Sequence, residues 1–148
     1  MRFFRLLPEV AGELGEKSII TYKNGMIESV QYLHYVLKGW LGDEVITQTP
    51  CFMISQRVLD ELSQQGITGC KVEQMLVTIS DEFQDSDKEL PSFVRLLPQG
   101  TIQVKDGKVT KWSGHDICLE DEVELVVSER AFNTISKYCN YCDIEELT

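Results

Sequence analysis

The chain is poor in basic residues and contains no cluster of them. Its 14 Lys and Arg are outnumbered by 24 Asp and Glu, which gives a formal net charge of −10 at pH 7. Binding to a phosphate backbone requires a surface of clustered Lys and Arg side chains, so this composition argues against nucleic acid as a partner. A protein partner with a basic surface is favoured instead.

Long apolar runs are also missing. No stretch of the sequence approaches the roughly 18 to 20 apolar residues that a membrane-spanning helix needs. The apolar start, Met1–Leu7, is interrupted by Arg and is ended by Pro8 and Glu9, so it is too short for a secretory signal. We therefore expect a cytoplasmic protein that does not bind membranes.

The common catalytic and nucleotide-binding motifs are absent from the sequence. It contains no G-x-S-x-G, no GxxxxGK[ST], no HExxH and no EF-hand loop. Neither His34 nor His115 lies in a motif with a Ser or Cys nucleophile and an acid to orient it. The sequence therefore predicts a non-enzymatic protein without catalytic residues or a cofactor.

Gly and Pro are few as well, with 10 and 4 residues respectively. With 43% hydrophobic and 26% charged residues, the composition excludes a fibrous or disordered chain and is typical of a globular protein. A chain of 148 residues is long enough to bury a substantial core as one domain.

What the sequence does contain is an internal sequence similarity, which we call the echo. The segment Trp40–Ile46 is echoed by Trp112–Cys118, with a Trp-x-Gly start in both copies. After nearly the same spacing, Ile54–Leu59 is echoed by Val127–Phe132. Similar segments in a preserved order are the signature of a duplication.

Two further matches extend this echo. Cys70–Met75 matches Cys142–Leu147 after a one-residue deletion, and the upstream motif Arg5–Pro8 recurs as Arg95–Pro98. Four matches in one order indicate an internal duplication. We predict a single domain over residues 1–148, with repeat 1 at about 1–80, an acidic linker at 81–92 and repeat 2 at about 93–148.

Each copy has the pattern of a strand, a helix and a short closing strand. Ser55 and Ser128 are placed to cap the N-terminus of each helix, and Gly66 to follow the end of the first. Asn24–Gly25 and Asp106–Gly107 are typical of tight hairpin turns. The sequence thus predicts an α+β fold of two degenerate strand-helix-strand repeats with β-hairpins, in which mixed or antiparallel sheets carry helices on one face.

The stretch 27–37 is ambiguous. Its apolar positions suit a helix, whereas its Val, Tyr and Ile content suits a strand.

Two segments carry almost all of the excess negative charge. Residues 81–89 have a net charge of −4, and residues 116–124 have a net charge of −5. The acidic residues of these segments are Asp81, Glu82, Asp85, Asp87, Glu89, Asp116, Glu120, Asp121, Glu122 and Glu124. Such runs are either solvated loops or a face that attracts a basic partner, and we take the ten residues as candidate contacts.

Five cysteines, an odd number, are expected to be reduced thiols in a cytoplasmic protein. Cys139 and Cys142 form a CxxC, but zinc needs four ligands, and only Cys118 and His115 are further candidates. A redox CxxC belongs at a helix N-terminus, whereas this one follows the end of its predicted helix. Structural thiols are favoured, and a small metal-binding or thiol-redox protein is the alternative function.

The Trp-x-Gly segments, the Ser-capped helices and the closing Cys-x-[Val/Ile]-Glu strands together resemble bacterial immunity proteins of polymorphic-toxin and contact-dependent competition systems. The resemblance is to the group with myxobacterial paralogues, and it is best over Trp112–Leu147 and fair over Trp40–Met75. Some relatives carry doubled CxxCG motifs. In this sequence a single CxxC is followed by Asp143 instead of Gly, so the resemblance does not imply a zinc site here.

The resemblance implies a non-enzymatic inhibitor that binds a cognate toxin and blocks its active site. The acidic segments are the expected contacts with such a toxin. A homodimer formed through an exposed sheet edge is a further alternative.

Overall fold

The computed structural model describes residues 1–83 and 89–148. The largest sheet has the order β12-β11-β13-β14-β1-β15, with β1 (Phe3–Leu7), β11 (Gly100–Lys105), β12 (Lys108–Trp112), β13 (Ile117–Glu120), β14 (Glu124–Ser128) and β15 (Asp143–Leu147). A second sheet has the order β6-β7-β10-β8, with β6 (Val45–Gln48), β7 (Cys51–Ser55), β8 (Cys70–Glu73) and β10 (Phe93–Pro98).

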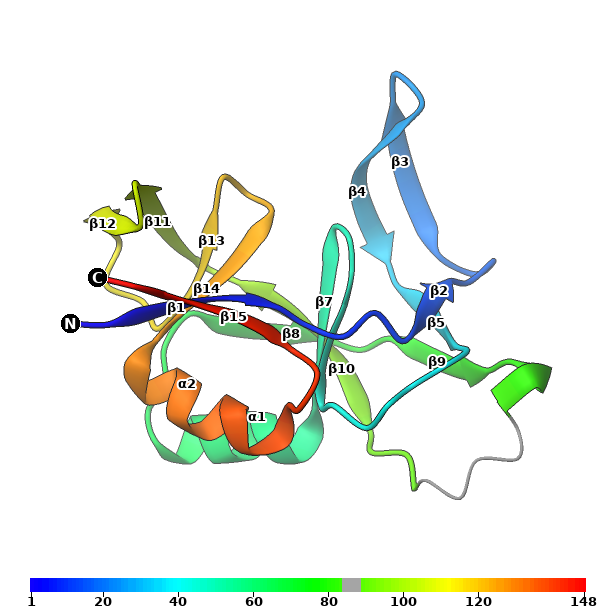
Figure 1. Cartoon of the computed structure of the whole chain (residues 1–148). Coiled ribbons are helices and arrows are strands. Elements are labelled where there is room, and N and C mark those ends of the chain that lie inside the picture. The colour runs from blue at the N-terminus through cyan, green and yellow to red at the C-terminus, as the bar shows by residue number, and fades with distance from the viewer. Residues whose placement is uncertain (84–88) are drawn as a thin grey trace.

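Two smaller sheets and two short helices complete the described fold (Figure 1). The remaining elements are β2 (Gly12–Leu14), β5 (His34–Leu37) and β9 (Leu76–Ile79) in one sheet, the hairpin β3 (Ile19–Lys23) and β4 (Met26–Tyr32), the helices α1 (Gln56–Gln64) and α2 (Glu129–Ile135), and the 3₁₀ turns η1 (Asp81–Phe83) and η2 (Ser136–Tyr138). Most strand pairs are antiparallel, whereas β11 with β13 and β5 with β9 are parallel. The protein therefore has mixed sheets with two short helices, and strands predominate.

The first strands of the two predicted repeats have matching positions. β1 lies between β14 and β15, and β10 lies between β7 and β8. The register is the same around both strands: Phe3 pairs with Ser128 and Arg5 with Glu145, while Phe93 pairs with Ser55 and Arg95 with Glu73. The strand that opens each predicted repeat is thus paired with strands that belong to the other.

The main core joins residues from both large sheets and both helices. It includes Phe4, Leu6, Leu125, Val127, Ala131 and Ile135 around the largest sheet, and Phe52, Ile54, Val58, Leu62, Val94 and Leu96 around the second. The rings of Phe4 and Phe132 stack with centroids 3.9 Å apart and planes 11° apart, which packs α2 onto β1. The helices lie side by side below the sheets in the view of Figure 1.

The predicted helix caps are confirmed. The Val58 N–H donates to Ser55 Oγ over 3.3 Å, and the Ala131 N–H donates to Ser128 Oγ over 3.4 Å. Gly66, just beyond α1, has φ of +71°, the left-handed conformation that favours glycine after a helix.

The two predicted hairpin turns are confirmed as well. Asn24 and Gly25 have φ of 54° and 77° between β3 and β4, and Asp106 and Gly107 have φ of 53° and 76° between β11 and β12. Two consecutive positive φ angles are what a type I′ turn requires.

The ambiguous stretch 27–37 forms strands. It supplies most of β4 and all of β5, and β5 lies between β2 and β9 in its sheet. Its Tyr35 and Leu37 are completely buried in the second core cluster, where a pleated strand places alternate side chains on one face. The helical interpretation of this stretch is therefore wrong, because the pairing of β4 with β3 and of β5 with β2 and β9 outweighs the helical spacing.

Candidate functional site

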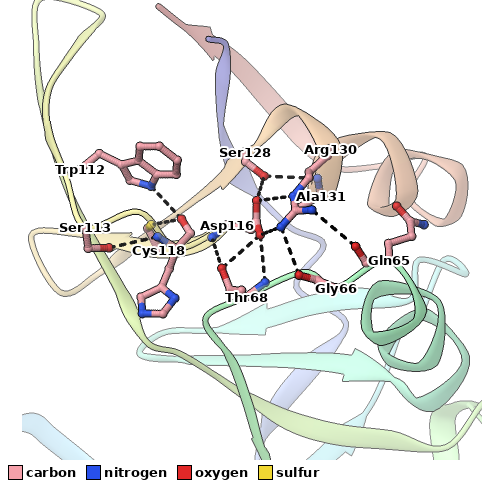
Figure 2. Close-up of polar contacts among 11 residues, drawn as sticks. Gln65, Gly66, Thr68, Trp112, Ser113, Asp116, Cys118, Ser128, Arg130 and Ala131 are labelled. Carbon is pink, nitrogen blue, oxygen red and sulfur yellow. Dashed lines mark hydrogen bonds and ion pairs between the residues drawn. The ribbon is translucent and has the colours of Figure 1, made fainter.

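Asp116 is a buried structural residue, not a surface contact. It is 5% exposed, and it accepts hydrogen bonds on both carboxylate oxygens (Figure 2). Arg130 Nε lies 2.9 Å from Oδ1 and Nη2 lies 2.6 Å from Oδ2, while Ser128 Oγ donates to Oδ1 over 2.6 Å. Burial alone would raise the pKa of the Asp116 carboxyl, but the bonds from Arg130 and Ser128 hold the pKa well below its usual value.

The Asp116 network also holds the chain that follows α1. The Thr68 N–H donates to Asp116 Oδ2 over 2.9 Å, and Arg130 Nη2 donates to the Gly66 carbonyl over 3.1 Å. Figure 2 shows these groups converging on the carboxylate from the segment 65–68 and from the start of α2. The side chains of Asp116 and Arg130 thus fix a loop of the other predicted repeat.

A matching network lies at the equivalent positions of the first predicted repeat. Arg57 donates to both oxygens of the buried Glu44, with Nε 2.7 Å from Oε1. The neighbouring Asp43 accepts from the N–H of Asn140 over 2.7 Å and of Tyr141 over 2.9 Å, in the loop after α2. Sequence reasoning missed these residues, although the echo aligns Glu44 with Asp116 and Arg57 with Arg130.

Arg5 neutralises part of the second acidic segment. Its Nη2 lies 2.7 Å from Glu120 Oε1 and its Nε lies 2.8 Å from Glu124 Oε2, and it also pairs with Glu145. Glu120 is 8% exposed. The segment 116–124 has no base within its own sequence, yet in space Arg130 and Arg5 oppose three of its five acids.

Three acidic residues of this segment stay at the surface, namely Asp121, Glu122 and Glu124, which pairs with Arg5. Asp121 and Glu122 form the turn between β13 and β14 with φ of 51° and 63°, a left-handed conformation that is costly for residues other than glycine. Both are exposed. Of the residues predicted in 116–124, this turn and the partly paired Glu124 are therefore the accessible ones.

The first acidic segment lies elsewhere. Asp81 and Glu82 belong to η1, Glu89 is exposed beyond it, and Asp85 and Asp87 lie outside the described residues. In Figure 1, η1 is at the right of the view and the β13–β14 turn is at the upper left. The described parts of the two segments therefore do not form one continuous acidic face, contrary to the simplest expectation from the sequence.

A groove of about 420 Å³ lies beside the β13–β14 turn. It is formed by the ends of β1, β14 and β15 on one side and by the turn between β6 and β7 on the other. The lining consists of Arg5, Leu6, Leu7, Thr47, Thr49, Pro50, Phe52, Val123, Glu124, Leu125, Asp143, Ile144 and Glu145. Leu6, Phe52 and Leu125 come from the main core, so the base of the groove is apolar.

The rim of the groove combines exposed apolar side chains with acids. Leu7 is 60% exposed, Val123 50% and Ile144 49%. Of the described residues that line the groove, three are acidic and Arg5 is the basic one, which leaves a net charge of −2. Apolar side chains gathered at a concave, charged surface are typical of a site for another molecule.

The cysteine candidates are separated into two parts of the core. Cys118 packs with Phe3 and Ile102 in a small cluster, and its Sγ lies 3.1 Å from the His115 carbonyl. Cys139 and Cys142 pack against the main core instead. Among residues 1–83 and 89–148, no group of three or more His, Cys, Asp and Glu side chains is placed to hold a metal ion.

Burial raises the pKa of the Cys139 thiol to about 11 and that of Cys142 to about 12. All five cysteines are free. Since the thiolate is the reactive and metal-binding form, these environments disfavour thiol chemistry near neutral pH.

No protein-family model matches this sequence, and no curated protein is similar enough to it to be counted as a relative. Within the part of the chain that the structure describes, no helix has the length and apolar character needed to cross a membrane.

Proposed function

We propose that this chain is an immunity protein, which neutralises a cognate bacterial toxin by binding it. The observation that carries the proposal is the acidic groove, where exposed Leu7, Val123 and Ile144 adjoin Glu124 and Asp143. The resemblance of the Trp-x-Gly and Ser-capped segments to immunity proteins supports the same function.

Electrostatics favour a basic partner. The groove has a net negative lining, the exposed Asp121 and Glu122 lie on the adjacent turn, and the whole chain carries −10. Complementary charge accelerates encounter with a basic protein, such as a nuclease whose substrate channel binds phosphates. The apolar rim would supply the contact area that charge alone does not.

We further propose that the fold is a duplicated unit whose opening strands are exchanged. Three features support this: the equal registers around β1 and β10, the equivalent pairs Glu44–Arg57 and Asp116–Arg130, and equivalent indole bonds. Trp40 Nε1 donates to the Asp43 carbonyl and Trp112 Nε1 to the His115 carbonyl, both over 2.7 Å. Such an exchange makes residues 1–148 one domain with helices on one face of its sheets.

The test of the immunity function is co-purification combined with a growth assay. The tagged protein is expressed in its native host, stoichiometric partners are identified, and the neighbouring reading frame is cloned as the toxin candidate. Expression of that candidate should arrest growth, and co-expression of this chain should restore it. Growth arrest that this chain does not relieve would refute the proposal.

The alternative function, a small metal-binding or thiol-redox protein, rests on Cys139 and Cys142. The two residues are three positions apart in the sequence, and both pack against the main core. Elemental analysis of protein purified without a His-tag tests the metal version, and stoichiometric zinc would favour it over the immunity function.

A further inference from the structure

We propose that the groove takes an extended segment of the partner, with alternating basic and apolar side chains, which adds as a strand to the free edge of β15. This inference rests on the proposed function as a protein-binding protein.

The outer edge of β15 is open along most of its length. β15 ends the largest sheet, and among the described residues it pairs with β1 alone. At its C-terminal end the chain continues into Thr148, whose C=O accepts from Val109 and whose N–H donates to Gly107. Residues 143–146 therefore present the open part of the edge, where backbone groups can pair with an added strand.

Acidic and apolar side chains alternate along residues 143–145 of this edge. Successive residues of a strand point to opposite faces, so Asp143 and Glu145 lie on one face and Ile144 lies on the other. Asp143, Ile144 and Glu145 all line the groove. An added strand would place its own side chains opposite these, face by face.

The two faces of this edge favour different side chains in an added strand. On the face of Asp143 and Glu145, Arg5 already pairs with Glu145, whereas the exposed Asp143 has no ion pair among the described residues. Asp143 is therefore the acid that favours a Lys or Arg from the added strand. On the other face, the half-exposed Ile144 favours an apolar side chain. Basic and apolar residues must therefore alternate in the segment that fits.

The edge of the second sheet provides an internal contrast. β8 ends that sheet, and the echo aligns Lys71 of β8 with Asp143 of β15 and Val72 with Ile144. Val72 is partly buried against the main core, whereas Ile144 is half exposed. The combination of an acid and an exposed apolar residue is thus a feature of β15 that its counterpart lacks.

The experiment measures binding of a fluorescein-labelled peptide of eight alternating Lys and Val residues, acetylated and amidated, by fluorescence anisotropy. A peptide with the same composition in two blocks, Lys then Val, tests the alternation, and a Glu–Val counterpart tests the charge. We expect saturable binding of the alternating peptide alone, with chemical-shift changes at the backbone amides of residues 143–146. Equal binding of the block peptide, or no saturable binding of the alternating one, would overturn the proposal.

Two exposed positions make a matched pair of variants. Asp143→Lys should weaken binding of the alternating peptide about three- to tenfold, as expected for reversing one exposed charge contact. Glu73→Lys on β8 makes the same change of charge away from the groove, and it should leave binding unchanged. Equal effects of the two variants would mean that net charge, not the β15 edge, governs binding.

The same variants separate this inference from the proposed function. If the growth assay shows full protection by Asp143→Lys and by wild type, and the toxin binds both equally, the immunity function stands and the β15 site is wrong. If the alternating peptide binds at residues 143–146 while no toxin is neutralised, the site stands and the immunity function is wrong. Circular dichroism at increasing temperature verifies that each variant is folded.

Discussion

Arg130 holds both oxygens of Asp116, with Nε 2.9 Å from Oδ1 and Nη2 2.6 Å from Oδ2. The same carboxylate binds the N–H of Thr68, which lies 48 residues earlier in the chain. One acid thus joins the start of α2 to the loop after α1. Removal of this carboxylate should therefore destabilise both halves of the molecule.

Asp116→Asn should destabilise the fold by about 1–3 kcal/mol, because it removes the charge from several hydrogen bonds in a buried position. Urea unfolding at pH 7, followed by circular dichroism, measures the change. Asp121→Asn removes one charge from an exposed turn residue and should alter stability by less than about 0.5 kcal/mol. Equal losses for the two variants would show that Asp116 has no special structural role.

The contribution of Asp116 should disappear in acid. Its pKa is lower in the folded protein than in the unfolded chain, so the unfolded state binds the proton more readily. The stabilisation is therefore fully present above the unfolded pKa of about 4 and is lost as the pH falls through the folded pKa. The difference in unfolding free energy between wild type and Asp116→Asn should shrink from pH 7 to pH 3, and a constant difference would contradict this account.

The CxxC thiols should be unreactive in the folded protein. With pKa values of about 11 for Cys139 and about 12 for Cys142, little thiolate is present at pH 7.5. A thiol reagent such as Ellman's reagent should modify both slowly in buffer and rapidly in urea. The double variant Cys139→Ser and Cys142→Ser identifies their share of the signal, and rapid modification of the folded protein would favour the redox alternative.

The β13–β14 turn should steer the partner. Charge reversal by Asp121→Lys and Glu122→Lys should slow association with the protein recovered by co-purification and weaken its dependence on salt. Surface plasmon resonance at two ionic strengths gives both quantities. The matched control is the double variant Glu16→Lys and Glu28→Lys. It makes the same change in net charge at exposed positions in the β2–β4 region. Identical association rates for the two double variants would exclude the turn from the contact.

The two N-cap serines should not be equivalent. Ser128 Oγ both caps α2 and donates to Asp116, whereas Ser55 Oγ caps α1. Replacement of Ser55 by Ala should cost about 1 kcal/mol, and replacement of Ser128 should cost more because Asp116 loses a donor as well. Denaturant unfolding of both variants in parallel makes the comparison.

Local features of the fold could be predicted from the sequence because their signals are local. A Ser before an apolar stripe, or an Asn-Gly pair between alternating residues, specifies a cap or a turn within a few residues. The stretch 27–37 could not be assigned, since its conformation depends on pairing with β9 more than 35 residues away. Intrinsic preference is too weak to decide between such alternatives.

The acidic site was predicted only in part for a similar reason. Counting charges along the chain identifies 116–124 as unopposed, but Arg5, which pairs with Glu120 and Glu124, is 115 residues away from the first of them. The groove was not predicted at all, because its two sides come from β1, β15 and the β6–β7 turn. The one signal that could have located Glu44 and Arg57 is the internal echo, applied to charged residues as well as apolar ones.

The position of β1 determines when this protein can finish folding during synthesis. Its partners β14 and β15 lie at residues 124–147, much later in the chain, so β1 stays unpaired until those residues have been made. Until then the apolar side chains of Phe4 and Leu6, which the finished core buries, have no sheet to join. The nascent chain must therefore be kept from aggregating until residues 124–147 have emerged.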